Sequence, residues 1–450
     1  MKQVEMYNKV KFDIQMIKKF IISFLFIICS LTLHALQSQS EDHMFLFTNL
    51  IILLMSSILI CFGDKYNYSI NKNVYVFIYF FFGISPLLQH DKKIKFWTEL
   101  PIGYNYYIKL NIIIILIIII YQFCYFFFNT KSKVNQKIYN ILIKFKIENI
   151  KIKKSRLVII SILSFFIILE NIDFNLKYLY LKNIYSLESS KMKLLILNHF
   201  IAVIPVVCLL IHKLSKDRNR KIEIVLLFIV LSCNFPTILA RNMVAQIYIP
   251  IFIVYFKSLR NFFILPGIVS VGLIYVFPFL NQFRYKNIID KIKFKVDLDM
   301  FLQAHFDAYQ NFLRLLEFRI QTNGQQLLGT ILFFIPRQFW QDKPIGSGAF
   351  LAQKLNFSFS NISMPYFAEG YINFGYLGII FFTILFAYIN AKLDKFFWIY
   401  SLKTYCSIVY LFYFSIVIFL LRGDLLSSFS YFIGSLLAII FVLKFCLIEI

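Results

Sequence analysis

Apolar runs close to the length of a membrane-crossing helix recur along the whole chain. About 20 apolar residues are needed for a helix to cross about 30 Å of hydrocarbon, where the backbone must satisfy its own hydrogen bonds. We find twelve runs, at roughly residues 20–36, 44–63, 74–89, 106–128, 157–172, 194–212, 223–239, 244–256, 262–280, 371–390, 404–421 and 428–447. They predict an all-α, polytopic membrane protein with about twelve transmembrane helices. The 59% share of hydrophobic residues is too high for an ordinary soluble domain.

The net charge of +24 is concentrated in connections that fall on one side of this predicted bundle. Basic residues gather before the first run, between residues 129 and 156, and between residues 213 and 222. Cytoplasmic loops of membrane proteins carry an excess of Lys and Arg, so both termini are expected in the cytoplasm. Membrane topology explains the charge, and the 129–156 connection has few aromatic residues among its cations. We therefore expect no nucleic-acid partner.

Cysteine and histidine positions indicate neither a disulfide framework nor a metal site. All seven cysteines fall inside predicted spans, and no C-x-x-C pair occurs. The six histidines are scattered and lack the spacing of metal ligands. We expect no metal and no cofactor.

One connection is much longer than the others and divides the chain unequally. It covers residues 281–370 and separates nine predicted spans in residues 1–280 from three in residues 371–450. The alternation of spans places it on the outer, periplasmic side. Within it, residues 298–318 have the spacing of an amphipathic helix, and residues 327–335 are apolar but too short to cross, which indicates an interfacial or re-entrant segment. No repeat relates two halves of the chain, which counts against many transporter folds.

Four arginines fall at or near the outer membrane boundary, where the charge rule does not call for them: Arg241, Arg284, Arg337 and Arg422. The guanidinium keeps its charge and offers a planar fork of donors that matches phosphate oxygens. Anchoring at a helix end explains any one of them. Four on one face favour a shared anionic ligand, and the diphosphate of a lipid carrier fits such a site.

The long connection also contains Pro-Arg-Gln-Phe-Trp-Gln-Asp-Lys-Pro at residues 336–344, followed by Gly348. It combines two cations, Arg337 and Lys343, with Trp340 on a scaffold of Pro and Gly. This combination predicts a site for an anionic, sugar-bearing ligand just outside the bilayer.

Four segments resemble the O-antigen polymerases, the Wzy-type oligosaccharide repeat-unit polymerases of bacterial envelopes. They are residues 241–243, 335–344, 368–378 and 422–424. The spacing from Arg337 to Gly348 also matches an Arg-x10-Gly pattern of such polymerases. The segments cover a minor part of the chain, whereas the predicted topology agrees over its full length.

The resemblance implies a metal-independent glycosyltransferase of the multi-span C type in a bacterial inner membrane, active at the periplasmic face. A growing glycan on undecaprenyl diphosphate would pass en bloc to a repeat unit on a second undecaprenyl diphosphate. The product would be the O-antigen of lipopolysaccharide or a capsule. The sugar–diphosphate bond supplies the energy, so no nucleotide is required. The expected partners are these lipid-linked oligosaccharides, membrane lipid and a chain-length regulator protein.

The roles expected of individual residues follow from this chemistry. Candidate catalytic residues are Arg337, Glu369 and Asp424, with the two carboxylates as alternative general bases. Candidate substrate-binding residues are Arg241, Arg284, Arg422, Lys343, Trp340, Gly348, His305 and Tyr366. His305 is a third option for the base, against the alternative that it is a hydrogen-bonded structural histidine.

Two other functions stay open. An O-antigen ligase, which hands the glycan to a lipid A core or to protein, shares the architecture and the anionic leaving group. A lipid-linked oligosaccharide flippase or another transporter is a non-enzyme that would be expected to show charged residues within its spans. Lys109 and Glu170 are the notable charges in the predicted spans, and both lie near predicted ends.

Overall fold

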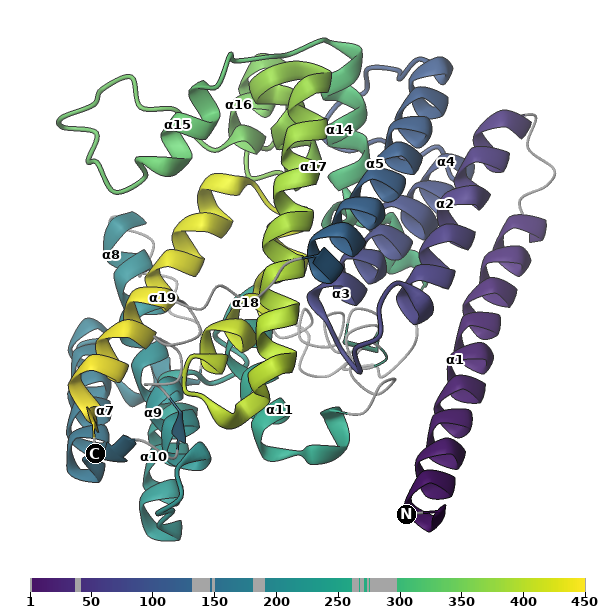
Figure 1. Cartoon of the computed structure of the whole chain (residues 1–450). Coiled ribbons are helices and arrows are strands. Elements are labelled where there is room, and N and C mark those ends of the chain that lie inside the picture. The colour runs from purple at the N-terminus through teal and green to yellow at the C-terminus, as the bar shows by residue number, and fades with distance from the viewer. Residues whose placement is uncertain are drawn as a thin grey trace.

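The computed structural model describes residues 2–36, 42–131, 146–147, 150–180, 191–260, 267, 271–272, 275 and 298–449. The described chain is almost entirely helical (Figure 1). Up to residue 260 the main elements are α1 (Lys2–Leu36), α2 (His43–Phe62), α3 (Ile70–Phe77), η1 (Ile78–Ile84), α4 (Ser85–Asp91), α5 (Tyr104–Lys131), α7 (Lys154–Asn171), α8 (Lys191–Leu195), η5 (Ile196–Ile201), α9 (Val203–Leu214), α10 (Arg220–Cys233) and α11 (Arg241–Tyr255). From residue 298 they are η9 (Leu298–Leu302), η10 (Ala304–Phe306), α14 (Ala308–Glu317), α15 (Gln325–Ile331), α16 (Ser347–Lys354), α17 (Tyr366–Tyr400), α18 (Ser407–Arg422) and α19 (Leu425–Cys446).

All but one of the twelve apolar runs overlap these helices, and the run at 262–280 lies largely outside the described residues. Six helical segments are long and apolar enough to cross a membrane: Ile17–Leu36, His43–Phe62, Tyr104–Thr130, Met192–Leu214, Tyr366–Tyr400 and Leu425–Cys446. The protein is therefore helical and suited to a membrane. Twelve crossings stay a prediction, because helices such as α10 (14 residues) and α11 (15 residues) are short for a full span.

Two of the expected spans contain a wide π-helical turn just before a proline. η1 ends directly before the turn that holds Pro86, and η5 precedes Pro205 in α9. Proline has no N–H and clashes with the carbonyl four residues earlier in an α-helix. A π-turn relieves this clash while the chain stays helical. Both spans thereby continue through their prolines.

α17 is two helices joined by a sharp break at Phe374 and Gly375, where Gly375 has φ 63°. Residues before the break fold back along those after it, since the rings of Tyr366 and Phe386 lie 4.7 Å apart. A Cβ on Gly378 would overlap the carbonyl oxygen of Gly370, so this close approach requires glycine. The sequence predicted a simple membrane entry near residue 371, whereas the structure forms a re-entrant turn there.

Residues 298–318 also differ from the single amphipathic helix that was expected. They form two 3-10 turns, η9 and η10, and then the short helix α14. The division falls at Asp307, whose carboxylate accepts hydrogen bonds from Asn311 and from the backbone N–H of Ser363. α14 is buried between α5 and α17, so it does not lie free in the interface plane.

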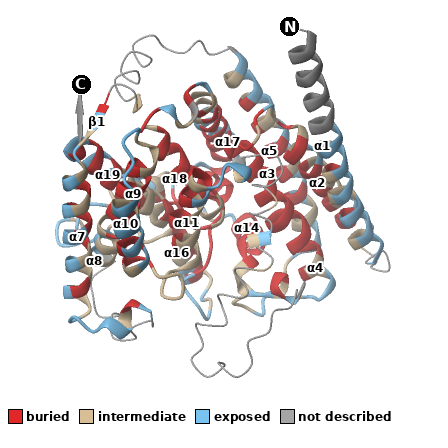
Figure 2. Ribbon diagram, turned by 90° about the horizontal axis from the view of Figure 1, so that it is seen from below, coloured by how far each residue is buried: buried red, intermediate tan, exposed pale blue. Residues whose placement is uncertain are grey.

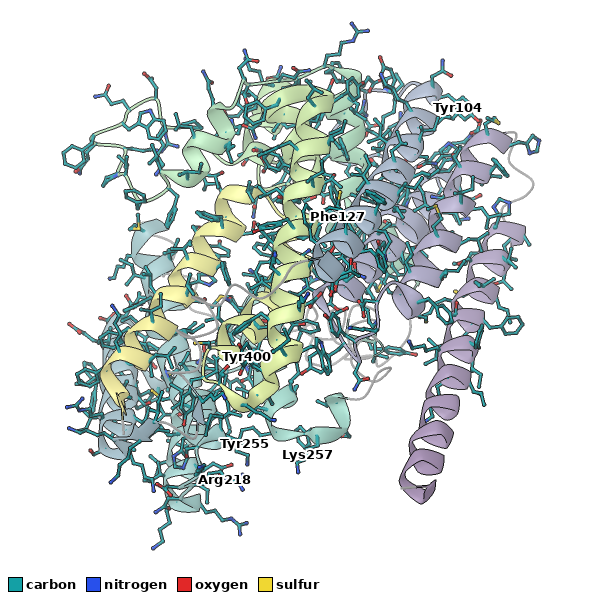
Figure 3. The ribbon with its side chains drawn as sticks, in the orientation of Figure 1. Tyr104, Phe127, Arg218, Tyr255, Lys257 and Tyr400 are labelled. Carbon is teal, nitrogen blue, oxygen red and sulfur yellow. The ribbon has the colours of Figure 1, made fainter. Side chains whose placement is uncertain are left out.

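Buried residues concentrate in α3, η1, α9 and α18, whereas α1 and α7 at the edges of the bundle show many exposed residues (Figure 2). α1 begins and α19 ends at the same end of the molecule (Figure 1). Arg218 and Lys257 also lie at that end, opposite to Tyr104 (Figure 3). A short antiparallel pair, β1 (Ile150–Ile152) with β2 (Leu447–Glu449), joins the basic 129–156 connection to the C-terminal segment.

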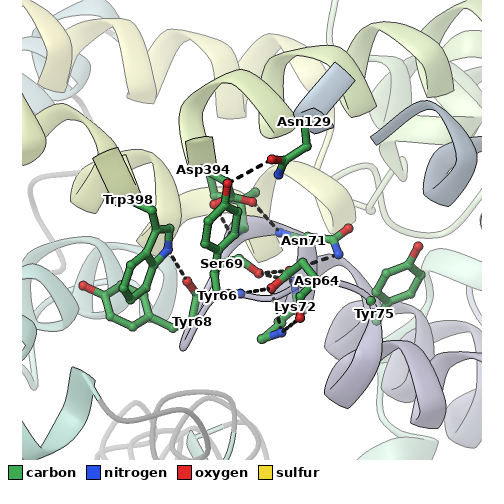
Figure 4. Close-up of polar contacts among 12 residues, drawn as sticks. Asp64, Tyr66, Tyr68, Ser69, Asn71, Lys72, Tyr75, Asn129, Asp394 and Trp398 are labelled. Atoms are coloured by element: carbon green, nitrogen blue, oxygen red, sulfur yellow. Dashed lines mark hydrogen bonds and ion pairs between the residues drawn. The ribbon is translucent and has the colours of Figure 1, made fainter. Parts of the chain in front are cut away.

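A buried polar network fastens the turn between α2 and α3 to the rest of the bundle (Figure 4). Lys72, whose side chain is fully buried, lies 2.8 Å from the carboxylate of Asp64. Asp394, from the second part of α17, accepts hydrogen bonds from the backbone N–H of Ile70 and from the hydroxyls of Tyr125 and Tyr410. The network thus joins α3, α5, α17 and α18 through groups that would be costly to bury alone.

The variant Lys72→Met should destabilise the protein by about 3–5 kcal/mol, because it leaves the Asp64 carboxylate buried without its cation. Thermal unfolding of the purified protein in detergent measures the effect. Lys65→Met is the matched control, since Lys65 is exposed. The double variant Asp64→Asn/Lys72→Met should regain part of the loss. Equal stability of Lys72→Met and Lys65→Met would contradict the role of the pair.

Candidate functional site

Two of the four outer arginines meet at one histidine. Arg241 begins α11, and its Nη2 lies 2.8 Å from Nε2 of His305. Arg422 ends α18, and its Nε donates to the backbone carbonyl oxygen of His305 at 2.7 Å. With Asp307 these residues form what we call the arginine–histidine centre. Helix packing explains the meeting, because α11 and α18 lie side by side and bring the start of one to the end of the other.

The hydrogen bond between Arg241 and His305 defines the state of the imidazole. A guanidinium donates hydrogen bonds and accepts none, so Nε2 of His305 must be the acceptor. The proton of a neutral imidazole then lies on Nδ1. A protonated imidazole would lose this bond and place a third positive charge beside Arg241 and Arg422.

Asp307 is the negative group of the centre, and it is 1% exposed. Its Oδ1 lies 3.5 Å from Nη2 of Arg422 and also accepts from the hydroxyl of Ser363. Its Oδ2 accepts from Nε1 of Trp97 at 3.2 Å and from Nδ2 of Asn311 at 3.0 Å. Neutral donors thus take much of the accepting capacity of Asp307. Arg422 is the guanidinium that meets this carboxylate, and Arg241 joins the centre through the imidazole of His305.

Asp307 and Trp97 were not predicted as site residues. Asp307 was expected on the polar face of a helix at 298–318. In the structure it accepts a hydrogen bond from Trp97, which holds the connection between residues 92 and 103 against the centre. Trp97 has φ 65°, an unusual backbone conformation for a large side chain, and its ring stacks on Phe359 at 5.0 Å. The chain has only three tryptophans, and the position of Trp97 in a polar connection was the available signal for a site residue.

Glu369 lies beside the centre as a buried joint between three helices. Its Oε2 accepts from the hydroxyl of Ser347 at 2.7 Å, and its Oε1 accepts from the backbone N–H of Leu425 at 2.8 Å. The side chain is 1% exposed. Glu369 therefore fastens the first turns of α16 and α19 to the folded-back part of α17.

Asp424 occupies the turn between α18 and α19, two residues after Arg422. Its carboxylate accepts from the backbone N–H of Ser427 at 2.9 Å and from the Ser427 hydroxyl at 3.0 Å, so it caps the N-terminus of α19. Gly346 packs directly against this carboxylate. Asp424 is only partly buried, and in the sequence it follows Arg422 of the centre by two residues.

Gly348 and Tyr366 have packing positions near this turn. A Cβ on Gly348 would overlap the carbonyl oxygen of Ile362, so the start of α16 comes very close to the chain there. Tyr366 is buried, with its ring against Phe382 and Phe386 in the fold-back of α17. In this arrangement the Tyr366 ring packs within the core.

Arg337, Lys343 and Trp340 lie in residues 332–345, which we call the projecting loop because it extends sideways from the bundle between α15 and α16 (Figure 1). Nη1 of Arg337 donates to the carbonyl oxygen of Lys343 at 2.7 Å. Nζ of Lys343 donates to the carbonyl oxygens of Phe333 and Ile335 at 2.5 and 2.8 Å. Partial burial, and then the charge of Arg337, lower the pKa of Lys343.

The structure therefore separates the predicted site residues into groups. Arg241, His305 and Arg422 come together, with Asp424 in the adjoining turn. The buried carboxylate of Glu369 fastens that turn by accepting a hydrogen bond from the N–H of Leu425. The hydrogen bonds of Arg337 and Lys343 are made to the projecting loop itself, and Arg284 lies outside the described residues.

The variant Glu369→Ala should destabilise the protein by about 1–3 kcal/mol or more, because the Ser347 hydroxyl and the Leu425 N–H would lose their acceptor inside the protein. Glu99→Ala is the control, since Glu99 is exposed. Melting temperatures of the two purified variants provide the comparison. Unchanged stability of Glu369→Ala would show that the carboxylate is not a structural joint.

Gly348→Ala should cost about 1–3 kcal/mol of stability, because the added methyl group meets backbone that cannot move aside without repacking α16. Gly272→Ala is the matched change, since a Cβ there meets no atom of the described residues within 4 Å. The same unfolding measurement applies, and equal effects of both changes would contradict the tight packing at Gly348.

Comparison with known proteins identifies no relative of this chain. No protein-family model matches it, and neither a curated protein nor a solved structure is similar to it. Among the residues that the structure describes, no group of three or more His, Cys, Asp or Glu side chains is placed to hold a metal ion. The functional conclusion therefore depends on the arginine–histidine centre and on the segments that resemble the polymerases.

Proposed function

We propose that this protein is a glycosyltransferase that polymerises undecaprenyl-diphosphate-linked oligosaccharide repeat units at the periplasmic face of a bacterial inner membrane. The product is a surface polysaccharide, an O-antigen or a capsule. The observation that carries the proposal is the convergence of Arg241 and Arg422 on His305. These arginines belong to two of the segments, residues 241–243 and 422–424, on which the resemblance to the polymerases depends.

The charge of the centre suits a diphosphate. Arg241 and Arg422 supply two guanidinium groups, and the Arg422 side chain is 29% exposed. Arg241 also begins α11, where the helix dipole places partial positive charge and favours an anion. A hydrogen bond to a charged group contributes about 1.5–3 kcal/mol, so two or three such bonds would select a diphosphate over a neutral lipid.

In the proposed reaction a hydroxyl of the acceptor sugar attacks the anomeric carbon of the donor glycan. A carbon–oxygen bond forms, the bond from that carbon to the diphosphate oxygen breaks, and the diphosphate leaves with the electron pair. Arg241 and Arg422 stabilise the negative charge that develops on the departing oxygen. Cleavage of the bond between the sugar and the diphosphate supplies the free energy of the transfer.

The hydroxyl proton requires an acceptor close to the arginines. Nε2 of His305 accepts a hydrogen bond from Arg241. A bound diphosphate would compete for the donors of Arg241 and release this lone pair to take the proton. Asp424 is the alternative base, because it is partly exposed in the adjoining turn. Glu369 is only 1% exposed and both of its carboxylate oxygens are engaged, which favours a structural role for that residue.

Arg241→Lys and Arg422→Lys should each lower the polymerisation rate about 10–100-fold, because a point charge replaces a fork of donors that contributes about 1.5–3 kcal/mol. The measurement is the length distribution of the surface glycan in cells that contain each variant at normal protein level. Arg319→Lys is the control, since Arg319 is an exposed arginine of the connection at residues 281–370. Long chains in both test variants would remove the centre from the reaction.

The surface glycan of cells and an assay of the purified protein separate the competing functions. Loss of a polymerase leaves single repeat units on the surface, whereas loss of a ligase leaves none. A flippase would produce no polymer when the purified protein is given two lipid-linked units.

Arg337→Ala and Arg337→Lys test the predicted role of Arg337, because long chains in both would exclude it from the site.

A further inference from the structure

A row of large apolar side chains is exposed along α15 and the projecting loop. Leu328 is 49% exposed, Ile331 53%, Phe334 58% and Phe339 83%. Phe339 is the most exposed large apolar side chain in the described part of the chain. Leu328 and Ile331 are three residues apart on α15 and therefore share one face of that helix. Such a contiguous apolar surface normally marks an interaction site.

The loop is braced so that these side chains do not fold inward. Lys343 and Arg337 donate to carbonyl oxygens at both sides of the loop, at residues 333, 335 and 343. A turn closed by the bond from the N–H of Phe339 to the carbonyl oxygen of Pro336 carries Phe339 outward. The cations thus hold the shape of the loop through its backbone, and the apolar side chains remain available outside.

The loop has a defined place beside one candidate span. α15 packs along α19, and the rings of Phe333 and Phe429 meet edge-on at 6.1 Å. α19 itself presents Leu437 and Phe441 outward, at 52% and 41% exposure, as expected of a helix that faces lipid. The apolar face of α15 is attached at the beginning of α19, where Phe429 and Phe432 are partly exposed, so it adjoins the surface of that span.

We propose that α15 and the projecting loop dock on the outer leaflet of the bilayer, with Leu328, Ile331, Phe334 and Phe339 at the boundary between headgroups and acyl chains. Continuity with the surface of α19 selects lipid as the occupant. Aromatic side chains accompanied by cations are also typical of membrane interfaces. Apolar faces of this kind enter about 5–10 Å into the boundary region. The proposal is independent of the proposed reaction and gives Arg337 and Lys343 a bracing role.

A nitroxide attached at Phe339→Cys tests the docking in the full chain, reconstituted in vesicles of phosphatidylethanolamine and phosphatidylglycerol. Cys29, Cys124 and Cys406 are first changed to Ser, because they are the exposed or partly exposed cysteines. Relaxation of the label by oxygen, which concentrates in lipid, is compared with relaxation by a water-soluble nickel chelate. Phe441→Cys is the lipid reference, and Lys92→Cys in the exposed turn after α4 is the aqueous reference.

The label at residue 339 should be relaxed more by oxygen than by nickel, as at residue 441 and opposite to residue 92. A label at residue 339 that behaves like the label at residue 92 would overturn the proposal. So would protection from nickel that appears only after undecaprenyl diphosphate is added, because the loop would then cover a ligand site. Neither result depends on glycan synthesis, so failure here is separate from failure of the proposed reaction.

Discussion

The cost of removing charge from water is the constraint on which this bundle depends. A buried ion loses several kcal/mol of hydration unless a partner and further hydrogen bonds compensate it. In the network of Asp64, Lys72 and Asp394, backbone N–H groups, hydroxyls and one ion pair meet that requirement. In the arginine–histidine centre, Arg422 meets the carboxylate of Asp307 and Arg241 meets the imidazole of His305. The first group fastens helices together, whereas the second is the one that we propose to bind an anion.

The irregular parts of the fold position the residues of the arginine–histidine centre and of the turn beside it. The break at Gly375 turns the start of α17 back into the bundle, which places Glu369 against the first N–H groups of α19. That contact fixes the short turn between Arg422 and Leu425. The division of residues 298–318 at Asp307 likewise puts one carboxylate beside Arg422 and ties Trp97 to it. Strain and breaks thus occur where the chain must position polar groups.

Hydropathy predicted the helices well because the requirement for lipid-facing apolar side chains acts locally along the sequence. The re-entrant turn of α17 was not predicted, since its signal is only the paired glycines at 370 and 378 within an apolar run. The placement of Arg241 and Arg422 on one side of the predicted bundle followed from the sequence, whereas their meeting depends on the packing of α11 against α18. The contribution of Asp307 did not follow from the sequence, because it depends on contacts with residues 97, 363 and 422, far away in the chain.

Arg337 and Arg422 illustrate why residue type alone does not define a binding site. Both carry the same donor fork, and both belong to segments that resemble the polymerases. Arg337 directs its donors to carbonyl oxygens six and seven residues away, in a loop that can form this bond on its own. Arg422 bonds to His305 and Asp307 from another part of the fold, so its position depends on the packing of the whole bundle. A site assembled from distant helices fixes its charged groups through packing, and the arginine–histidine centre is where we propose that an anion binds.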